Sequence, residues 1–574
     1  MNSTQLWFDQ LKAFFVFDPK APFIFTSALF WIFFICVLVV HALIHKRHTL
    51  RILFLFIASI FFYYKTTGIF FLLLVWTAGW DYFMALFIER TGSAGKKKAW
   101  LVASIVMNLG VLVYFKYAYF FTDSFNTITG SNYPVFNWFG HWSNSFFGTH
   151  FSVDKIILPI GISFFTFQSI SYTVEVFRGT LKPLKRFTDY AFFVSFFPQL
   201  VAGPIVRASE FIPQISRPYV LLRGTLGLAI FWILNGLIKK IFLSDFLAVQ
   251  FIDRVFDNPV VYTGFENLLA VFGYSLQVYA DFSGYTDIAI GVAMIMGFQL
   301  SINFNSPYKA TNVSDFWRRW HISLSTWLRD YLYIPLGGNQ KGTIGSYILL
   351  GLFVAIVSLL SQSWIVLSMS FIVLAIAIGT ASLVPTFGKW MNTNLNLMLT
   401  MLIGGMWHGA SWNFIIWGGL NGLGLVWYKL WRKISPWENK NVWYFRAWSI
   451  FLTFAFISFT RVWFRSGSST GWSNMDHTHN VTDEFMSATV MLGRIFQGMD
   501  VSVVPRVLAA YWQVCLVFVV GMVVHWLPTS FKEMYRKRFS ELPYWAMTLA
   551  CFIVVVMVYQ VLVAGTQPFI YFQF

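Results

Sequence analysis

Long, nearly uncharged apolar segments recur along the whole chain, and they constrain its fold more than any other feature. Phe23–Val40, Trp100–Phe121 and Trp545–Val563 are examples, and Ile348–Ile378 is another, with a polar break at Ser361–Ser363. A helix crosses the ~30 Å hydrocarbon core with about 20 apolar residues, and backbone groups at that depth must bond within the helix. The sequence therefore predicts an all-α polytopic integral membrane protein with roughly 11–15 transmembrane and re-entrant helices.

The net charge is +17, although only 11% of the residues are charged. Basic residues gather in short loops between apolar segments, so the positive-inside rule predicts that these loops are cytoplasmic. Membrane lipid, and not nucleic acid, accounts for this charge. Thr122–Asp154 and Ser466–Gly493 contain no lysine or arginine and are predicted to lie on the opposite side. The basic loops are His45–Arg51, Lys96–Lys98, Arg178–Arg186, Tyr428–Arg446 and Lys532–Arg538.

Alternation between these loops predicts that both ends of the chain lie outside the cytoplasm. The start, Leu6–Phe17, is amphipathic and is predicted to lie along the membrane surface. The tail Gln567–Phe574 follows the last apolar segment. Between about Phe187 and Leu243 simple alternation fails, which indicates re-entrant pieces.

Two short patterns in the polar stretch after Arg465 do not indicate a site. Gly467–Gly471 matches the spacing of a nucleophile elbow, but no strand precedes it. Asp476, His477 and His479 could ligate a metal, yet nothing nearby completes a coordination set. We therefore expect a solvated loop here and no metal site.

The segment Asp315–Asn339 combines aromatic side chains, arginines and a histidine. As one helix it would present an aromatic face toward the bilayer and guanidinium groups toward headgroups or a phosphate-bearing ligand. His321 falls on the apolar face, where a structural role is favoured over a catalytic one from the spacing alone. That face consists of Trp317, Trp320, His321, Leu324, Trp327, Leu328 and Tyr331, and Arg318, Arg319, Ser325 and Arg329 occupy much of the rest.

The segment Gly404–Gly422 is glycine-rich and contains His408. Glycines four residues apart, such as Gly405 and Gly409, permit close approach of membrane helices. On a helix, His408 and Trp412 share one face, with Asn413 beside them. A leucine would insert into the membrane more favourably than a histidine, so a functional role is slightly favoured here.

Two aspartates, Asp281 and Asp287, interrupt a long apolar stretch. Charged groups inside a membrane are expensive, so these side chains are predicted to face the protein interior or a wet cavity. They could orient a histidine or stabilise a helix junction, and the sequence favours neither.

Five ordered motifs together resemble one family. They are LPIGISFFTFQSISYTVEVFRG at Leu158–Gly179, FFPQLVAGPIVR at Phe196–Arg207, YADFSGYTDIAIG at Tyr279–Gly291, and the two histidine segments. Their order and length resemble the membrane-bound O-acyltransferase family, in its bacterial alginate O-acetylation branch, over about 154–465. The ending FIYFQF is also typical of that branch.

The resemblance implies transfer of an acyl group, acetyl in this branch, from a cytoplasmic thioester to a hydroxyl acceptor across the membrane. The motif histidines correspond to His321 and His408, which would lie in a tunnel where donor and acceptor meet. A free imidazole has a pKa of about 6.5 and can take a hydroxyl proton as general base. The other histidine would orient the acceptor or stabilise the oxyanion. His408 is favoured as base because its helix looks more buried, but the reverse order stays open.

No permanently bound cofactor is expected, and acetyl-CoA or another acyl thioester would enter as the donor substrate. Arginine forks suit phosphate, so four cations are predicted to hold the donor at the cytoplasmic mouth, with headgroup anchoring as the alternative. An aromatic wall would exclude water from the thioester. The four cations are Lys309, Arg318, Arg319 and Arg329, and the predicted tunnel residues are Trp317, Trp320, Trp327, Trp407, Asn413 and Asp281.

The apolar pattern and the resemblance together predict four parts. Residues 1–22 form an amphipathic N-terminal segment, 23–153 the N-terminal transmembrane helices, 154–465 the catalytic core, and 466–574 a C-terminal loop and transmembrane helices. The chain would reside in a bacterial inner membrane, with an exported polysaccharide and a periplasmic or cell-surface acyltransferase as partners. D-alanyl transfer from a carrier protein to teichoic acid is one alternative, and a transporter or polymer channel without covalent chemistry is another.

Overall fold

The computed structural model describes residues 15–18, 23–148, 151–438, 440, 442–469 and 481–563. Over these ranges the chain consists of α-helices, short 3₁₀- and π-helices and connecting loops, with no strand among the described residues. The predicted all-α membrane fold is confirmed. Most of Leu6–Phe17, the tail Gln567–Phe574, and Asp476, His477 and His479 lie outside the described residues.

The helices follow one another in three groups. The N-terminal group comprises α2 (Ala28–Ile44), α3 (His48–Thr67), η1 (Gly68–Phe70), α4 (Phe71–Arg90), α5 (Ala94–Leu112), the π-helix η2 (Val113–Tyr117), α6 (Ala118–Thr129) and α7 (Trp138–Phe147). The central group comprises α8 (Ile162–Arg178), α9 (Phe187–Ser195), α10 (Phe197–Leu200), α11 (Ala208–Ile215), α12 (Arg223–Leu237), η3 (Ile238–Asp245), η4 (Ala248–Ile252), α13 (Asp253–Asp257), η5 (Pro259–Val261), α14 (Gly264–Ile295), η6 (Pro307–Lys309), α15 (Val313–Arg319), α16 (Ile322–Leu328) and η7 (Arg329–Tyr333). The last group comprises α17 (Ile344–Leu360), α18 (Trp364–Leu383), α19 (Pro385–His408), α20 (Trp412–Ile434), α21 (Trp443–Ser469), α22 (Val481–Gln497), η8 (Val501–Val503), α23 (Val504–Ala510), α24 (Trp512–Trp526), α25 (Thr529–Ser540) and α26 (Tyr544–Val563).

Five helical stretches are long and apolar enough to cross a membrane, or seven if each of two sharply bent helix pairs counts as one span. These numbers apply to the described residues and rest on length and composition. The predicted total of roughly 11–15 helices is larger because it also included re-entrant and partial spans. Many helices of the structure are too short to count as full spans. The region that resisted alternation contains such pieces, since α9 and α10 are short and buried. The five stretches are His48–Arg90, Ala94–Thr129, Arg223–Asp257, Trp364–Leu383 and Trp443–Ser468.

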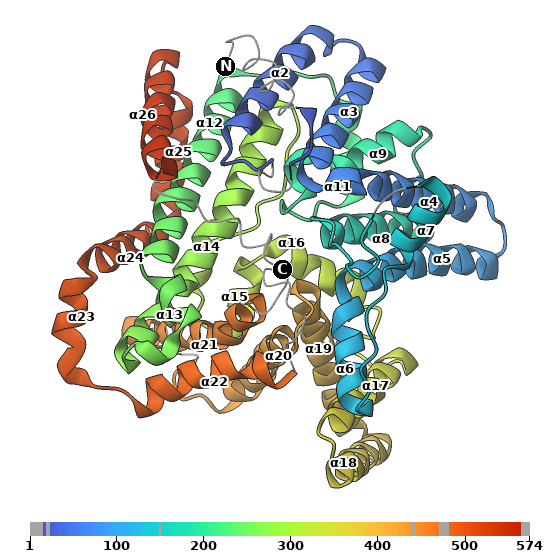
Figure 1. Ribbon diagram of the computed structural model, residues 1–574, viewed down its shortest axis with the longest axis vertical. Coiled ribbons are helices and arrows are strands. Elements are labelled where there is room, and N and C mark those ends of the chain that lie inside the picture. The colour runs from blue at the N-terminus through green and yellow to red at the C-terminus, as the bar shows by residue number, and fades with distance from the viewer. Residues whose placement is uncertain are drawn as a thin grey trace.

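The long helices α12 and α14 lie side by side in the middle of the fold (Figure 1). Glycines allow this approach: a Cβ on Gly236 of α12 would lie 2.5 Å from the carbonyl oxygen of Gly284 in α14. Seven residues further along α14, about two helical turns, a Cβ on Gly291 would lie 2.5 Å from the carbonyl oxygen of Ala229. The buried face of α14 therefore carries Asp281 and Asp287 into the protein interior, as the sequence predicted.

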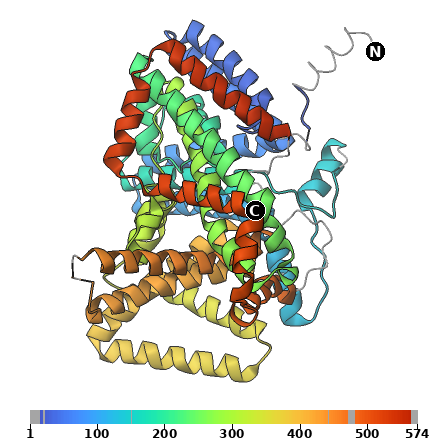
Figure 2. The same ribbon diagram turned by 90° about the vertical axis from the view of Figure 1, so that its left-hand side faces the viewer.

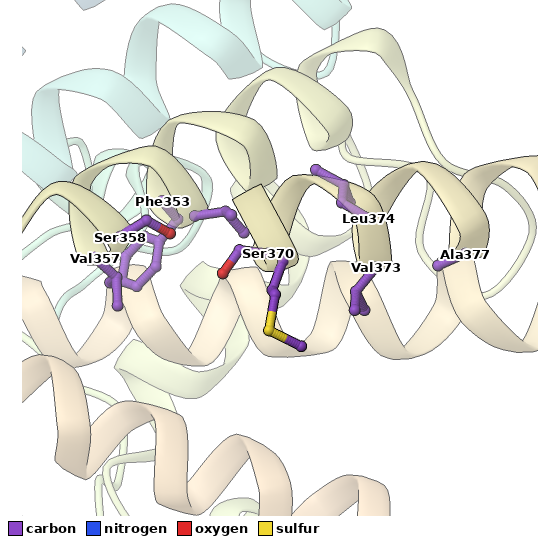
Figure 3. A pocket seen from close by; sticks show the side chains of 9 residues that line it. Phe353, Val357, Ser358, Ser370, Val373, Leu374 and Ala377 are labelled. Atoms are coloured by element: carbon purple, nitrogen blue, oxygen red, sulfur yellow. The ribbon is translucent and has the colours of Figure 1, made fainter. Parts of the chain in front are cut away.

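The helices α17 and α18 form a pair at one end of the molecule (Figure 2). They separate at Ser361–Ser363, where the sequence predicted a polar break. None of the residues in the apolar window of α18 is buried within the protein, so its surface suits contact with lipid tails. Between the two helices lies an open apolar groove of about 540 Å³, lined by residues such as Phe353, Val373 and Ala377 (Figure 3).

Candidate functional site

His321 lies at a break between two short helices. The predicted continuous helix is wrong here, because α15 ends at Arg319 and α16 begins at Ile322. His321 adopts φ +45°, a left-handed conformation that costs energy for a residue with a side chain. The preceding loop takes up the backbone groups that the break frees: the Ile322 N–H donates to the Asn303 carbonyl (3.0 Å), and the Asn305 N–H donates to the Arg319 carbonyl (2.9 Å).

The hydrogen bonds around His321 fix its tautomer. Its ring is fully buried, and Nδ1 lies 3.2 Å from Oδ1 of Asn303. The same Oδ1 accepts hydrogen bonds from the Ser323 N–H (3.1 Å) and hydroxyl (3.0 Å). A backbone N–H can only donate, so the amide must present its oxygen there, and His321 Nδ1 must be the donor. Nε2 therefore carries the lone pair, and it has no hydrogen-bond partner within the described part of the chain.

His408 is the last residue of α19, and the chain reverses at Gly409–Ser411 before α20 begins. The prediction that His408 and Trp412 share a face of one helix is therefore wrong. The glycines act between the helices instead: a Cβ on Gly405 would lie 2.3 Å from the Phe414 carbonyl oxygen. A Cβ on Gly418 would lie 2.3 Å from the Met401 carbonyl oxygen. These glycines therefore allow α19 and α20 to pack closely as a helical hairpin, with His408 at its turn.

The two breaks bring the histidines together. Their ring centroids are 6.4 Å apart, although the residues are far apart in sequence. The ring of His408 packs edge-on against Trp417 (5.1 Å) and Phe464 (5.3 Å), and His321 packs against Phe282 (4.7 Å). Both imidazoles thus lie in a buried aromatic environment in which electrostatic interactions with a substrate are strong.

A cavity of about 360 Å³ extends to His408. Three cations, Arg318, Arg329 and Lys429, line it together with polar side chains from several helices. A substrate with a negative group at one end and a reactive group at the other would match this arrangement. The lining residues are Ser314, Trp317, Arg318, Ile322, Leu324, Ser325, Thr326, Leu328, Arg329, Tyr333, Asn339, Leu397, Thr400, Met401, Gly404, Gly405, His408, Trp417, Leu425 and Lys429.

The cations that line the cavity differ in how far their charge is compensated. Arg329 pairs with Asp330 (2.6 Å), which also binds Arg207. Although partial burial opposes it, hydrogen bonds from these two arginines hold the pKa of Asp330 below its usual value, so this carboxylate stays ionised. Arg318 and Lys429 instead donate to neutral oxygens, of Ser314 and Asn394 respectively. Their charges are the ones most available to an anionic ligand.

Two of the predicted donor-binding cations lie elsewhere. Arg319 pairs with Asp315 (3.0 Å), four residues earlier on α15. Lys309 donates to the carbonyl oxygen of Leu527 (2.8 Å), just past the end of α24. Neither belongs to the cavity lining. Arg319 therefore forms an ion pair within its own helix, and Lys309 binds a carbonyl oxygen beside a helix C-terminus.

The predicted aromatic wall is divided between the cavity and the layer behind it. Trp317 lines the cavity, whereas Trp320, Trp327 and Trp407 do not. Trp327 stacks on Phe167 with a centroid separation of 3.7 Å, and Trp407 packs on the same ring at 5.3 Å. Trp407 also packs against both histidine rings, with centroid separations of 6.1 Å to His321 and 5.0 Å to His408. Trp407 thus packs directly against the histidines, and Trp327 lies behind it on the ring of Phe167.

Asn413 and Asp281 also lie outside the cavity lining. The buried Asn413 is the second residue of α20, where its N–H donates to the Ser411 hydroxyl (3.1 Å). Asp281 forms a salt bridge with Lys240 (2.6 Å), which also binds Asp245 (2.7 Å). Asp287 likewise pairs with Lys239 (2.7 Å). Of the two readings left open for these aspartates, the ion pairs favour stabilisation of the junction between η3 and α14.

The comparisons with known proteins agree with this architecture. The model of the membrane-bound O-acyltransferase family matches residues 56–360. The chain belongs to this family. It is therefore an acyltransferase, and His321 lies within the matched range whereas His408 lies beyond it.

Individual members of the family extend the similarity. A peptidoglycan O-acetyltransferase of Helicobacter pylori is 36% identical over 72% of this chain and 71% of its own length. Probable alginate O-acetylases of Pseudomonas putida and Pseudomonas aeruginosa are each 38% identical over 66% of this chain, which spans 64% and 60% of their lengths. A teichoic acid D-alanyltransferase of Bacillus subtilis is 27% identical over 54% of this chain.

Three residues of this candidate site were not predicted from the sequence. Lys429 was predicted only to belong to a cytoplasmic loop. Asn303 is not part of any motif recognised in the sequence. Lys116 is a single lysine within an apolar segment. The isolated Lys116 was the one detectable signal, since an unpaired cation within a membrane segment is costly. In the fold its Nζ donates to the His408 carbonyl (3.1 Å).

Proposed function

We propose that this acyltransferase moves an acetyl group from acetyl-CoA on the cytoplasmic side to hydroxyl groups of an exported polysaccharide. The acetyl group would reach the polysaccharide directly or through a periplasmic acyltransferase, and the bacterial inner membrane is the proposed location. One observation carries the proposal: a cavity with cations along it extends to one of two adjacent buried histidines. The names of the relatives, which are O-acetylases of peptidoglycan and alginate, support the acetyl group and the polysaccharide.

Arg318 and Lys429, with Arg329, are proposed to bind the donor phosphates. Arg318 and Arg329 are among the cations predicted for the cytoplasmic mouth, and Lys429 belongs to the basic stretch Tyr428–Arg446, which is predicted to face the cytoplasm, where acetyl-CoA is found. Arginine and lysine suit this task because phosphate needs several charge-assisted donors. Arg319 and Lys309 are left out because both bind within the protein.

In the transfer step, the acceptor hydroxyl oxygen attacks the thioester carbonyl carbon while a base takes the hydroxyl proton. His321 is proposed as that base, since its Nδ1–H is donated to Asn303 and Nε2 carries the lone pair. The tetrahedral intermediate then expels the thiolate of coenzyme A, which recovers the proton. His408 lines the cavity and is proposed to orient the thioester or to stabilise the oxyanion. From the sequence, His408 was favoured as the base because its helix looked more buried; the proposal here assigns that role to His321.

The test uses purified protein in proteoliposomes with acetyl-CoA and a soluble oligosaccharide acceptor, and it measures free thiol and acetylated product. His321→Ala is expected to lower kcat by about 10²–10⁴-fold, the usual contribution of a general base. His41→Ala is the matched control, because His41 is a buried histidine of α2 that packs on Tyr219. Wild-type turnover by both His321→Ala and His408→Ala would refute the proposed centre.

D-alanyl transfer to teichoic acid is the second candidate, favoured by the similarity to a teichoic acid D-alanyltransferase. A cationic mouth would suit the phosphopantetheine arm of a carrier protein as well as coenzyme A. Turnover of a D-alanyl carrier protein without turnover of acetyl-CoA would select this candidate. Transport without covalent chemistry has no support from the family to which the chain belongs, and Asp281 and Asp287 are both paired with lysines.

A further inference from the structure

Two neighbouring side chains of the π-helix η2 bind the end of α19. Nζ of Lys116 donates to the carbonyl oxygens of Trp407 (2.7 Å) and His408 (3.1 Å). The Tyr117 hydroxyl donates to the carbonyl oxygen of Met406 (2.7 Å). The last four carbonyls of an α-helix have no partner within the helix. Three consecutive carbonyls at the His408 end of α19 thus receive hydrogen bonds from one short segment of another helix.

All hydrogen-bond donors of the Lys116 amino group are used within the protein. The side chain is buried, and its ammonium group also donates to the Ser163 hydroxyl (3.2 Å) at the start of α8. An ammonium has three N–H donors, and three acceptors surround it. The lysine therefore serves as a fixed cation and has no spare donor for a substrate.

The charge of Lys116 suits the site it occupies. The C-terminal end of a helix carries a partial negative charge, which a nearby cation stabilises. A charged side chain within a membrane segment is expensive without such a partner. Short π-helical segments within α-helices are rare and are frequent at functional sites. Here the π-helix places two adjacent donors on the same helix end, although neighbouring side chains of an α-helix point about 100° apart.

We propose that η2 is a brace that positions His408, and that Lys116 and Tyr117 are positioning residues for acyl transfer. The chain turns away at Gly409 directly after His408, so no further helical turn holds this residue in place. The brace supplies the missing constraint from the N-terminal helices, far outside the motifs that contain the histidines. The role in acyl transfer rests on the proposed function of His408, whereas the positioning itself does not.

The first experiment compares two variants of the brace with two matched controls. Lys116→Met and Tyr117→Phe remove the donors and keep most of the side-chain volume. Lys65→Met is the control for the lysine, because Lys65 is buried and its Nζ donates to the carbonyl oxygen of Val16. Tyr63→Phe is the control for the tyrosine, because the buried Tyr63 hydroxyl donates to the carbonyl oxygen of Ile160 (2.9 Å).

Lys116→Met is expected to lower kcat by about 100-fold, the loss that a displacement of about 1 Å can cause. The KM for acetyl-CoA should stay unchanged, because the cations that line the cavity are intact. Tyr117→Phe should have the same pattern with a smaller loss, and Lys116→Arg should recover part of kcat because it restores the charge. The controls should keep the wild-type kcat. One control should melt below the brace variants and the other above them, so that loss of stability alone does not explain the loss of kcat.

A second measurement reports on the position of residue 408 and does not depend on enzyme activity. In a chain whose three cysteines are replaced, His408→Cys is labelled with a membrane-permeant maleimide through the cavity. Lys116→Met should raise the labelling rate about tenfold, because the freed carbonyls let the helix end fray, and Lys65→Met should not. If His408→Ala kept full activity but this rate rose, the catalytic role of His408 would fail and the brace would stand.

Two results would overturn the brace. One is a labelling rate at residue 408 that Lys116→Met and Tyr117→Phe both leave unchanged. The other is a loss of kcat that follows the melting temperature equally in Lys116→Met and Lys65→Met, which would indicate general destabilisation. Should Lys116→Met fail to fold, Tyr117→Phe gives the same two readings.

Discussion

The two histidines of the site lie at helix breaks that are held in different ways. The break at His321 is held locally, by Asn303 and the loop 18 residues before it. The break at His408 is held by η2, in which Lys116 precedes it by 292 residues. The strained conformation at His321 is thus fixed by residues nearby in the sequence, whereas the end of α19 is held by residues that only the fold brings to it. Three further experiments test this difference.

The largest effect is expected at the local break. Asn303→Leu removes the acceptor of the His321 Nδ1–H and of both Ser323 donors. The imidazole then loses its fixed tautomer and orientation, so kcat should fall by about 100-fold. Asn303→Asp keeps the acceptor oxygen and should retain most of the activity. Equal turnover of the leucine variant and wild type, measured with acetyl-CoA in proteoliposomes, would show that His321 does not depend on Asn303.

A smaller effect is expected along the cavity that extends to His408. Arg318→Gln or Lys429→Gln should raise the KM for acetyl-CoA about tenfold, because a charge-assisted hydrogen bond contributes about 1.5–3 kcal/mol. Since the reacting groups are untouched, kcat should change little. Arg319→Gln is the matched control, because Arg319 pairs with Asp315. A KM that rises equally in the control and in the two variants would contradict the assignment of the donor phosphates.

The smallest effect on turnover, with a clear effect on stability, is expected in the hairpin of α19 and α20. A methyl group on Gly405 would meet the Phe414 carbonyl oxygen at 2.3 Å. Gly405→Ala should lower the free energy of unfolding by about 1–3 kcal/mol, as overpacking does. Gly351→Ala is the control, since nothing lies within 4 Å of the added atom. Similar melting temperatures for the two variants would mean that close packing of this hairpin is not required.

The membrane fold could be predicted because apolar length and charge distribution act locally along the sequence. The break at Ser361–Ser363 and the burial of Asp281 were visible for the same reason. Helical periodicity failed at His321 and His408, where tertiary hydrogen bonds and close packing override it. Arg319 and Lys309 illustrate a second limit. Residue type suggested phosphate ligands, and the contacts of these side chains with Asp315 and the Leu527 carbonyl are visible only in the fold.

The residues that hold the site could not be predicted because their roles depend on contacts between distant segments. Asn303 is an ordinary loop residue until the break at His321 brings the Ser323 N–H to its oxygen. Lys116 is an isolated charge until the C-terminal end of α19 lies beside it. Motif order identified the histidines, and only the fold identified what holds them.

If the two breaks form one catalytic centre, the histidines must act as a unit. The most direct measurement is a double-mutant cycle of His321→Ala and His408→Ala, read as kcat for acetyl-CoA turnover in proteoliposomes. Residues that act as a unit are strongly non-additive, so the double variant should turn over about as slowly as the slower single variant. Losses that multiply in the double variant would contradict a shared centre, because each histidine would then contribute independently.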